Sequence, residues 1–212
     1  MIILNTLLFA LRGRPMRWLR NVLFALCVFT PAEGIAYPRC NNVREVDFRN
    51  LVYPLNDDDI TDGATKWLRV VRGRYEDSGR PESSYIYLEV TDVVFGDLTG
   101  DEKEEAAVAA VFGGVNATFY KSDTYIFACT SGRLKLIGVL KQNRIREDTG
   151  MWLHEPVRHP VRISNGTLLV THGTEGAHFG PTFRTTFRYK IVQGKLVPRG
   201  RPVRRRIRYP EN

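Results

Sequence analysis

The stretch of sequence that decides the fold is FYKSDTYIFACTSGRLKLIGVLK, residues 119–141. Two runs rich in β-branched, aromatic and leucine residues, 119–129 and 133–141, flank the turn Thr130-Ser131-Gly132. A turn of this kind suits a tight hairpin, because glycine tolerates the positive φ angles that such turns need. The stretch therefore predicts two antiparallel strands joined by a short turn.

The same pattern recurs twice towards the C-terminus. The runs and turns are, in chain order, 161–163 and 167–171 around Ser164-Asn165-Gly166, and 183–192 and 196–197 around Gln193-Gly194-Lys195. Repeated turns at short spacing favour an antiparallel meander over βαβ units, which need longer connections.

The remaining segments complete the predicted fold. Strands are predicted at 67–75, which alternates in polarity, and at 85–95, which is rich in β-branched and aromatic residues. The alanines of 104–112 favour a helix, but its valines and the glycine pair behind it fit a buried strand, which we predict. One short helix is predicted over 57–68, where threonine or aspartate can cap its start. We therefore expect a mostly β fold, an antiparallel meander or sandwich with one short helix.

The N-terminus carries the features of an export signal. Two apolar runs, 2–11 and 22–29, are separated by arginines, and neither approaches the roughly 20 residues of a membrane-spanning helix. The second run follows a short basic head and precedes small residues that end at Ala36, as in a signal peptide. We predict a signal peptide over 1–36, with Met16 as the true start, and an exported protein, periplasmic or secreted. An uncleaved, membrane-anchored N-terminus is the alternative.

The charge is distributed unevenly along the chain. The whole sequence has 31 Lys and Arg against 23 Asp and Glu, but the predicted single domain, 37–198, carries 21 of each. The excess positive charge lies at the two ends, so it does not by itself identify a nucleic-acid-binding protein. We expect no membrane span in the mature chain. An Arg-rich tail, 199–212, is predicted to contact an anionic envelope polymer, or else to be a solvated segment. Its arginines are Arg199, Arg201, Arg204, Arg205, Arg206 and Arg208.

Removal of the signal peptide leaves two of the three cysteines, Cys40 and Cys129. An even pair in an exported protein predicts a disulfide, with two free thiols as the alternative.

An acidic loop, Asp97 to Glu105, is the strongest local signal for a binding site. Oxygen-bearing side chains stand at its first, third, fifth and ninth positions, and Gly100 permits a sharp turn. Calcium takes 6–8 oxygen ligands, which a tight loop can supply from alternate residues together with a backbone carbonyl. We predict a calcium site made by Asp97, Thr99, Asp101, the carbonyl of Lys103, and Glu105. The alternative is a metal-free turn in which Asp97 caps backbone amides.

The loop and its flanks, VVFGDLTGD (93–101) followed by EAAV (105–108), resemble the FG-GAP or VCBS-type motif. They are also similar to the Asp-Leu-Thr-Gly-Asp-Gly-x-x-Glu-Ala signature of small exported bacterial proteins of unknown function. The resemblance implies a strand, a calcium loop and a second strand. Two positions depart from the pattern, Glu102 in place of glycine and Thr99 where an aspartate or asparagine is usual. A single copy in so short a chain excludes a full β-propeller.

A second candidate site is the polar loop that holds His172, Glu175 and His178. These residues could serve a metal-dependent hydrolase, but zinc needs three or four convergent ligands and the spacing repeats no strand or helix face, so zinc is the weaker expectation. The chain has no Gly-x-Ser-x-Gly nucleophile motif and no phosphate-binding Gly-rich loop. We therefore expect a non-enzymatic binding or envelope module.

Overall fold

The computed structural model describes residues 37–55, 65–77, 86–114, 120–175 and 180–208, without the side chains of 114, 120 and 155–159. The predicted signal peptide therefore lies outside the described residues. Tyr37 begins a compact unit that is separate from the first 36 residues. Among the described residues, no helix is long and apolar enough to cross a membrane.

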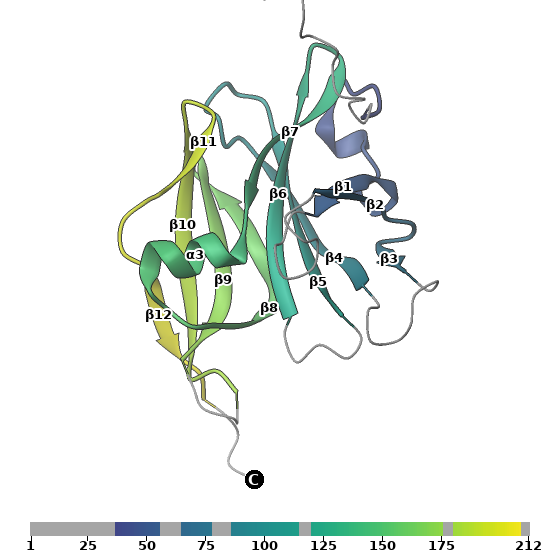
Figure 1. Ribbon diagram of the computed structural model, residues 1–212. Coiled ribbons are helices and arrows are strands. Elements are labelled where there is room, and N and C mark those ends of the chain that lie inside the picture. Colours follow the sequence, from purple (N-terminus) through teal and green to yellow (C-terminus); the bar gives the residue numbers. More distant parts are fainter. Residues whose placement is uncertain (1–36, 56–64, 78–85, 115–119, 176–179, 209–212) are drawn as a thin grey trace, which may run out of the picture. The chain divides into compact units, whose positions relative to one another are not determined.

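An antiparallel sheet of five consecutive strands, here called the central sheet, runs through the middle of this unit (Figure 1). Its strands, in spatial and chain order, are β3 (Arg74–Glu76), β4 (Ile86–Gly96), β5 (Glu105–Gly114), β6 (Tyr120–Thr130) and β7 (Arg133–Leu140). The predicted β6–β7 hairpin is confirmed. Ser131 and Gly132 have φ angles of 53° and 71°, the two left-handed conformations that a type I′ turn requires.

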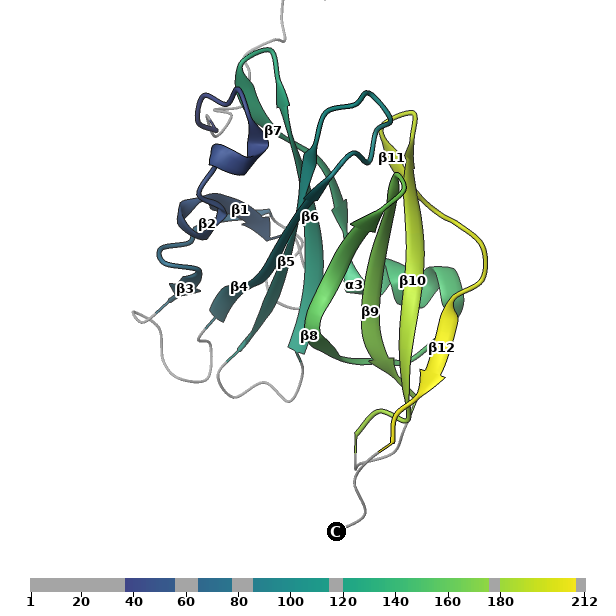
Figure 2. The same ribbon diagram turned by 180° about the vertical axis from the view of Figure 1, so that it is seen from behind.

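A second antiparallel sheet, here called the outer sheet, faces the central one (Figure 2). Its strands are β8 (Leu153–Ser164), β9 (Thr167–Thr174), β10 (Phe183–Val192), β11 (Lys195–Pro198) and β12 (Val203–Arg206). They run in the order β11-β10-β9-β8, and β12 pairs with β10. Both predicted hairpins are confirmed here, with positive φ angles at Asn165 and Gly166 and at Gln193 and Gly194.

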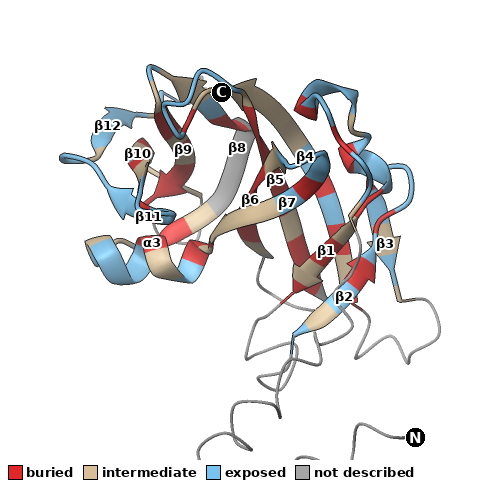
Figure 3. Ribbon diagram, turned by 90° about the horizontal axis from the view of Figure 1, so that it is seen from above, coloured by how far each residue is buried: buried red, intermediate tan, exposed pale blue. Residues whose placement is uncertain are grey.

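A third, smaller layer covers the other face of the central sheet. It contains the pair β1 (Val52–Leu55) and β2 (Lys66–Arg69) and two 3-10 turns, η1 (Val43–Glu45) and η2 (Phe48–Asn50). Figure 3 shows this layer and the outer sheet on opposite sides of the central strands.

Strand β5 is buried on both faces because it lies between these two layers. Val108 and Ala110 pack in the core shared with the N-terminal layer, whereas Ala107 and Ala109 pack in the core shared with the outer sheet. Small side chains let the layers approach closely on both sides. The prediction of a strand rather than a helix over 104–112 is thereby confirmed.

The described residues contain one short helix, at a place where none was predicted. Residues 56–64 are outside the described part, and the end of the predicted 57–68 helix is strand β2. The helix is α3 (Gln142–Thr149), whose N-cap Lys141 makes no capping side-chain hydrogen bond. Instead the N–H of Gln142 donates to Asp123 Oδ1 on β6, at 3.1 Å. A distant strand therefore satisfies the first turn of this helix.

Two further expectations need correction. The predicted strand over 67–75 is broken by a turn at Arg72 and Gly73, where the φ angles are 53° and 87°. The Arg-rich tail is not separate from the domain, since Val203–Arg206 forms β12 and pairs with Phe183 to Thr186 of β10.

Cys40 and Cys129 form the predicted disulfide, with a Cα–Cα distance of 5.4 Å across a sequence separation of 89 residues. The N–H of Cys40 also donates to the carbonyl of Gly132, which holds the N-terminal segment against the β6–β7 turn. On the chain-entropy model, closing a loop of this length stabilises the fold by about 4–5 kcal/mol.

Candidate functional site

The acidic loop leaves β4 where this strand lies closest to the outer sheet. A Cβ atom added at Gly96 would lie 2.6 Å from Ile163 Cγ2 of β8, so only glycine fits this approach. The loop then turns at Gly100, which has a φ of 81° as expected for a sharp turn, and re-enters the sheet at Glu105.

Asp97 holds the loop closed through its backbone amides. Its Oδ1 accepts a hydrogen bond from the N–H of Gly100 at 2.6 Å, and its Oδ2 accepts one from the N–H of Glu102 at 3.1 Å. Glu102, which stands where the resembled pattern has glycine, keeps a left-handed φ of 66°. Glutamate therefore occupies a backbone conformation here that glycine adopts more readily.

The hydroxyl of Thr99 brings two carboxylates together. Its Oγ1 lies 3.0 Å from Asp101 Oδ1 and 3.2 Å from Glu105 Oε1. The second oxygen of Glu105, Oε2, accepts hydrogen bonds from the N–H groups of Leu98 at 2.7 Å and Thr99 at 3.2 Å. Glu105 thus joins the start of the loop to the start of β5.

Glu105 and Asp101 differ in exposure and in the direction in which their pKa values are shifted. Glu105 is only 2% exposed, and burial raises its pKa despite the hydrogen bonds that favour its charged form. Asp101 is exposed, and its pKa is lowered chiefly by the hydrogen bond from the N–H of Lys103, at 3.1 Å.

Three of the five predicted ligands, Thr99, Asp101 and Glu105, therefore share one cluster of oxygens. Asp97 faces the loop amides, and the N–H of Lys103 donates to Asp101, while the ligand role of the Lys103 carbonyl stays a prediction. In the described parts of the chain, no three His, Cys, Asp or Glu side chains converge as a metal site. A cation here would depend on the hydroxyl, a carbonyl or water for several ligands. Calcium binding stays a prediction.

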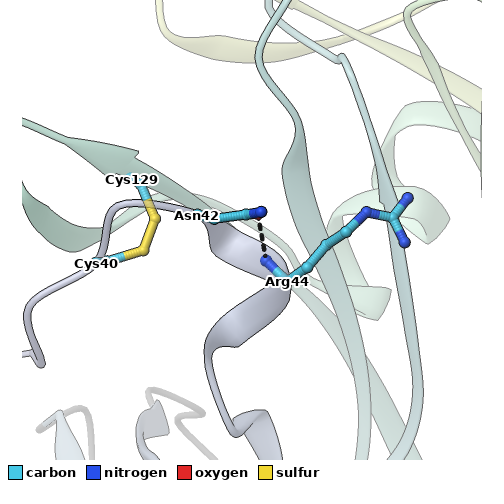
Figure 4. Close-up of a disulfide and its surroundings, with 4 residues drawn as sticks. All are labelled: Cys40, Asn42, Arg44 and Cys129. Carbon is cyan, nitrogen blue, oxygen red and sulfur yellow. Dashed lines mark hydrogen bonds between the residues drawn. A yellow bond between two sulfur atoms is a disulfide. The ribbon is translucent and has the colours of Figure 1, made fainter.

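A cleft of about 470 Å³ opens beside the loop. Its walls include Thr99, Asp101 and Glu105 on one side and Asn42 and Cys129 on the other. Figure 4 shows Asn42 next to the disulfide, with its Oδ1 accepting the N–H of Arg44 at 3.0 Å. The N-terminal segment is thus fixed as the second wall. Nothing local in the sequence indicated that it would meet the acidic loop.

An ion pair joins the two walls. Arg44 Nη2 donates to Glu104 Oε1 at 2.7 Å, and the guanidinium carbon of Arg44 lies 4.9 Å from the centre of the Phe95 ring. Glu104 is therefore neutralised. Asp97, Asp101 and Glu105 form no ion pair with any described Lys or Arg.

The predicted histidine site is divided between different environments. His172 lies on β9, 1% exposed, with its ring against Phe187, and its ring nitrogens make no well-formed hydrogen bond beyond an interaction with the backbone of His154. Burial lowers its pKa to about 4. Glu175 is on the surface and pairs with Arg204 Nη2 at 2.6 Å. His178 lies outside the described residues, so the trio as a whole stays a prediction.

The arginines of the predicted tail do not form one cluster. Arg204 pairs with Glu175 and lies over the Phe183 ring at 4.2 Å, while Arg205 stands on the opposite face of β12, across from Arg184. Contact with an anionic envelope polymer through the tail stays a prediction.

Comparisons with protein-family models, with curated protein sequences and with solved structures gave no match.

Proposed function

We propose that the chain is an exported, non-enzymatic binding domain whose acidic loop takes up a calcium ion. The ligands would come from Asp97, Thr99, Asp101, Glu105 and the carbonyl of Lys103. Bound calcium would supply positive charge to three of the five carboxylates of the loop, Asp97, Asp101 and Glu105, none of which forms an ion pair with a described Lys or Arg. Oxygen donors of this kind are the ligands that calcium prefers.

One observation carries the proposal. The single hydroxyl hydrogen of Thr99 faces two carboxylate oxygens, at 3.0 and 3.2 Å, and it can be donated fully to only one of them. The other carboxylate is then left against a hydroxyl lone pair, in a place where burial already disfavours the charge of Glu105. A divalent cation would remove this conflict.

The proposed role of calcium is to hold one wall of the cleft. The same loop lines the cleft beside Cys129, and the opposite wall is already fixed by the disulfide and by Arg44. A loop with calcium bound would give a polar ligand two rigid walls. The predicted export of the chain suits this role, because calcium is abundant outside the cytoplasm.

The test is a calcium titration of the full chain by calorimetry and thermal unfolding. Saturating calcium, at about a hundred times its Kd, is expected to stabilise the fold by about 2.7 kcal/mol. For a domain of this size that corresponds to a rise in Tm of roughly 5–10 °C, which a chelator should reverse. Magnesium should give a smaller shift, because it demands a stricter geometry.

Two substitutions make the test specific. Without calcium, Glu105→Gln is expected to leave the fold at least as stable as the parent, because burial raises the pKa of Glu105 and so disfavours its charged form. The same substitution should abolish the calcium shift. The matched control is Glu147→Gln, which removes an exposed carboxylate from α3 and should leave the shift intact. A parent protein with no heat of binding and no change in Tm would refute the proposal.

A further inference from the structure

The outer sheet has one face that no other described helix or strand covers, although Pro181 and His154 pack against it at Gly173. Alternate residues of β8–β11 pack in the core shared with the central sheet, and the residues between them lie on the opposite face, together with Val203 and Arg205 of β12. The strand register places these outward residues in rows. One row is Arg162, Leu169 and Arg188 on three neighbouring strands, and another places Arg184 directly opposite Arg205.

This outer face, defined by the outward residues of β8–β12, combines cations with aliphatic side chains. Its basic residues are Arg162, Arg184, Arg188, Lys190, Lys195 and Arg205. Its aliphatic residues are Leu169, Val192, Val197 and Val203, of which the three valines are 50%, 41% and 36% exposed. Among the residues of these strands whose side chains are described, none is acidic.

The six cations have no partner in the described structure. None of them forms an ion pair or a side-chain hydrogen bond with a described residue. Arg204, which points to the other face of β12, pairs with Glu175 instead. Like charges directly opposite each other on paired strands, as at Arg184 and Arg205, are destabilising unless an anion lies between or above them.

We propose that this outer face binds a planar surface of anionic lipid. The inference is independent of the proposed calcium site, since the two use different residues and different sheets. Strands stand roughly 4.8 Å apart and outward residues roughly 6.6 Å apart along each strand, so the cations are spread over two dimensions rather than along a line. A planar array of phosphate headgroups matches that distribution, and basic residues near such a surface are attracted by its negative potential.

The valines distinguish a lipid surface from a linear polyanion. Val192 and Val197 are diagonal neighbours on β10 and β11, whereas Val203 lies opposite Thr186 near the other end of β10, so aliphatic and basic side chains are interspersed over this face. At a membrane the valines can enter the boundary between headgroups and acyl chains while the neighbouring arginines contact phosphates. A linear polyanion in water would leave them exposed.

The test measures binding of the full chain to vesicles of one part phosphatidylglycerol and three parts phosphatidylcholine, with a chelator present so that calcium cannot bridge protein and lipid. We expect binding that weakens as salt is added, and little binding to pure phosphatidylcholine. Replacing Arg162, Arg188 and Arg205 by Gln together should weaken binding roughly a hundredfold. Every variant keeps residues 1–36, so any contribution of the N-terminal apolar runs is common to all.

The matched control replaces three exposed cations elsewhere, Arg69, Arg133 and Lys135, by Gln, and should change vesicle binding by no more than about twofold. Replacing Val192, Val197 and Val203 by Thr should weaken binding to vesicles and leave binding to dextran sulfate unchanged. Equal losses in the two charge variants would overturn the proposal. The proposal would also fail if two results came together: dextran sulfate binds more tightly than vesicles, and the threonine variant binds both ligands as tightly as the parent. The ligand would then be a linear polyanion.

Discussion

Strands β5 and β10 are each ten residues long and lie inside their sheets, yet they differ in the polarity of their side chains. Apart from Glu105, β5 has only apolar and glycine residues, and both of its faces are buried between layers. β10 alternates Thr185, Phe187 and Tyr189 on the buried side with Arg184, Arg188 and Lys190 on the side away from the central sheet. The number of covered faces, rather than the strand structure itself, sets the residues that each strand can accept.

The largest expected effect is from a charge placed on β5. Ala107→Asp faces the outer sheet and Ala110→Asp faces the N-terminal layer, and each should destabilise the fold by several kcal/mol, because the carboxylate would be buried without a partner. Arg188→Asp on β10 faces away from the core and should change the free energy of unfolding by less than about 1 kcal/mol. Denaturant unfolding of the three variants measures the contrast.

If the aspartate variants of β5 are insoluble, Ala107→Ser and Ala110→Ser make the same comparison with a smaller loss of stability. Two-sided burial of β5 would be contradicted if either alanine position accepted aspartate as readily as position 188 does.

The buried side of the outer sheet should make stability sensitive to acid. His172 titrates at about 4 in the folded state against 6.5 when unfolded. The unfolded chain therefore takes up a proton at higher pH than the folded chain, and stability falls as the pH drops from 6.5 towards 4. The loss from this one residue is about 3 kcal/mol. His172→Leu should flatten urea-unfolding stability over this window. An unchanged slope in the variant would show that His172 is not the source.

The smallest expected change in the free energy of unfolding comes from substitutions in two turns, one beside β5 and one beside β10. Glu102 beside β5 and Gln193 beside β10 are both in the left-handed region without being glycine or asparagine. Glu102→Gly and Gln193→Asn should each raise stability by about 0.5–1 kcal/mol, because the new residues adopt that conformation at lower cost. Thermal unfolding with Gly132→Ala as the reverse control, which should be destabilising, tests this. A loss of stability in Glu102→Gly would show that the glutamate has a role beyond the turn.

Much of the fold could be predicted where the determinant is local. The turns at Ser131-Gly132, Asn165-Gly166 and Gln193-Gly194 were predicted because few residues tolerate two successive positive φ angles. The similar turn at Arg72-Gly73 carries a weaker signal and was missed, so one predicted strand became two. The site was predicted in part, since Thr99, Asp101 and Glu105 meet as expected.

Other features depended on contacts between distant segments. The start of α3 is supported by Asp123, about twenty residues earlier on β6, so no local capping side chain marks where this helix begins. The cleft likewise exists because the disulfide brings the N-terminal segment to the acidic loop.

The sequence alone determined the antiparallel strands, their hairpin turns, the cysteine pair and the acidic loop, because each depends on residues that are neighbours or on a simple count. Only the tertiary structure decided which strands are covered on both faces, where the helix forms, and that arginines from β8, β10 and β12 stand on one surface. Burial and strand register are set by all the layers together, and no local pattern of residues contains them.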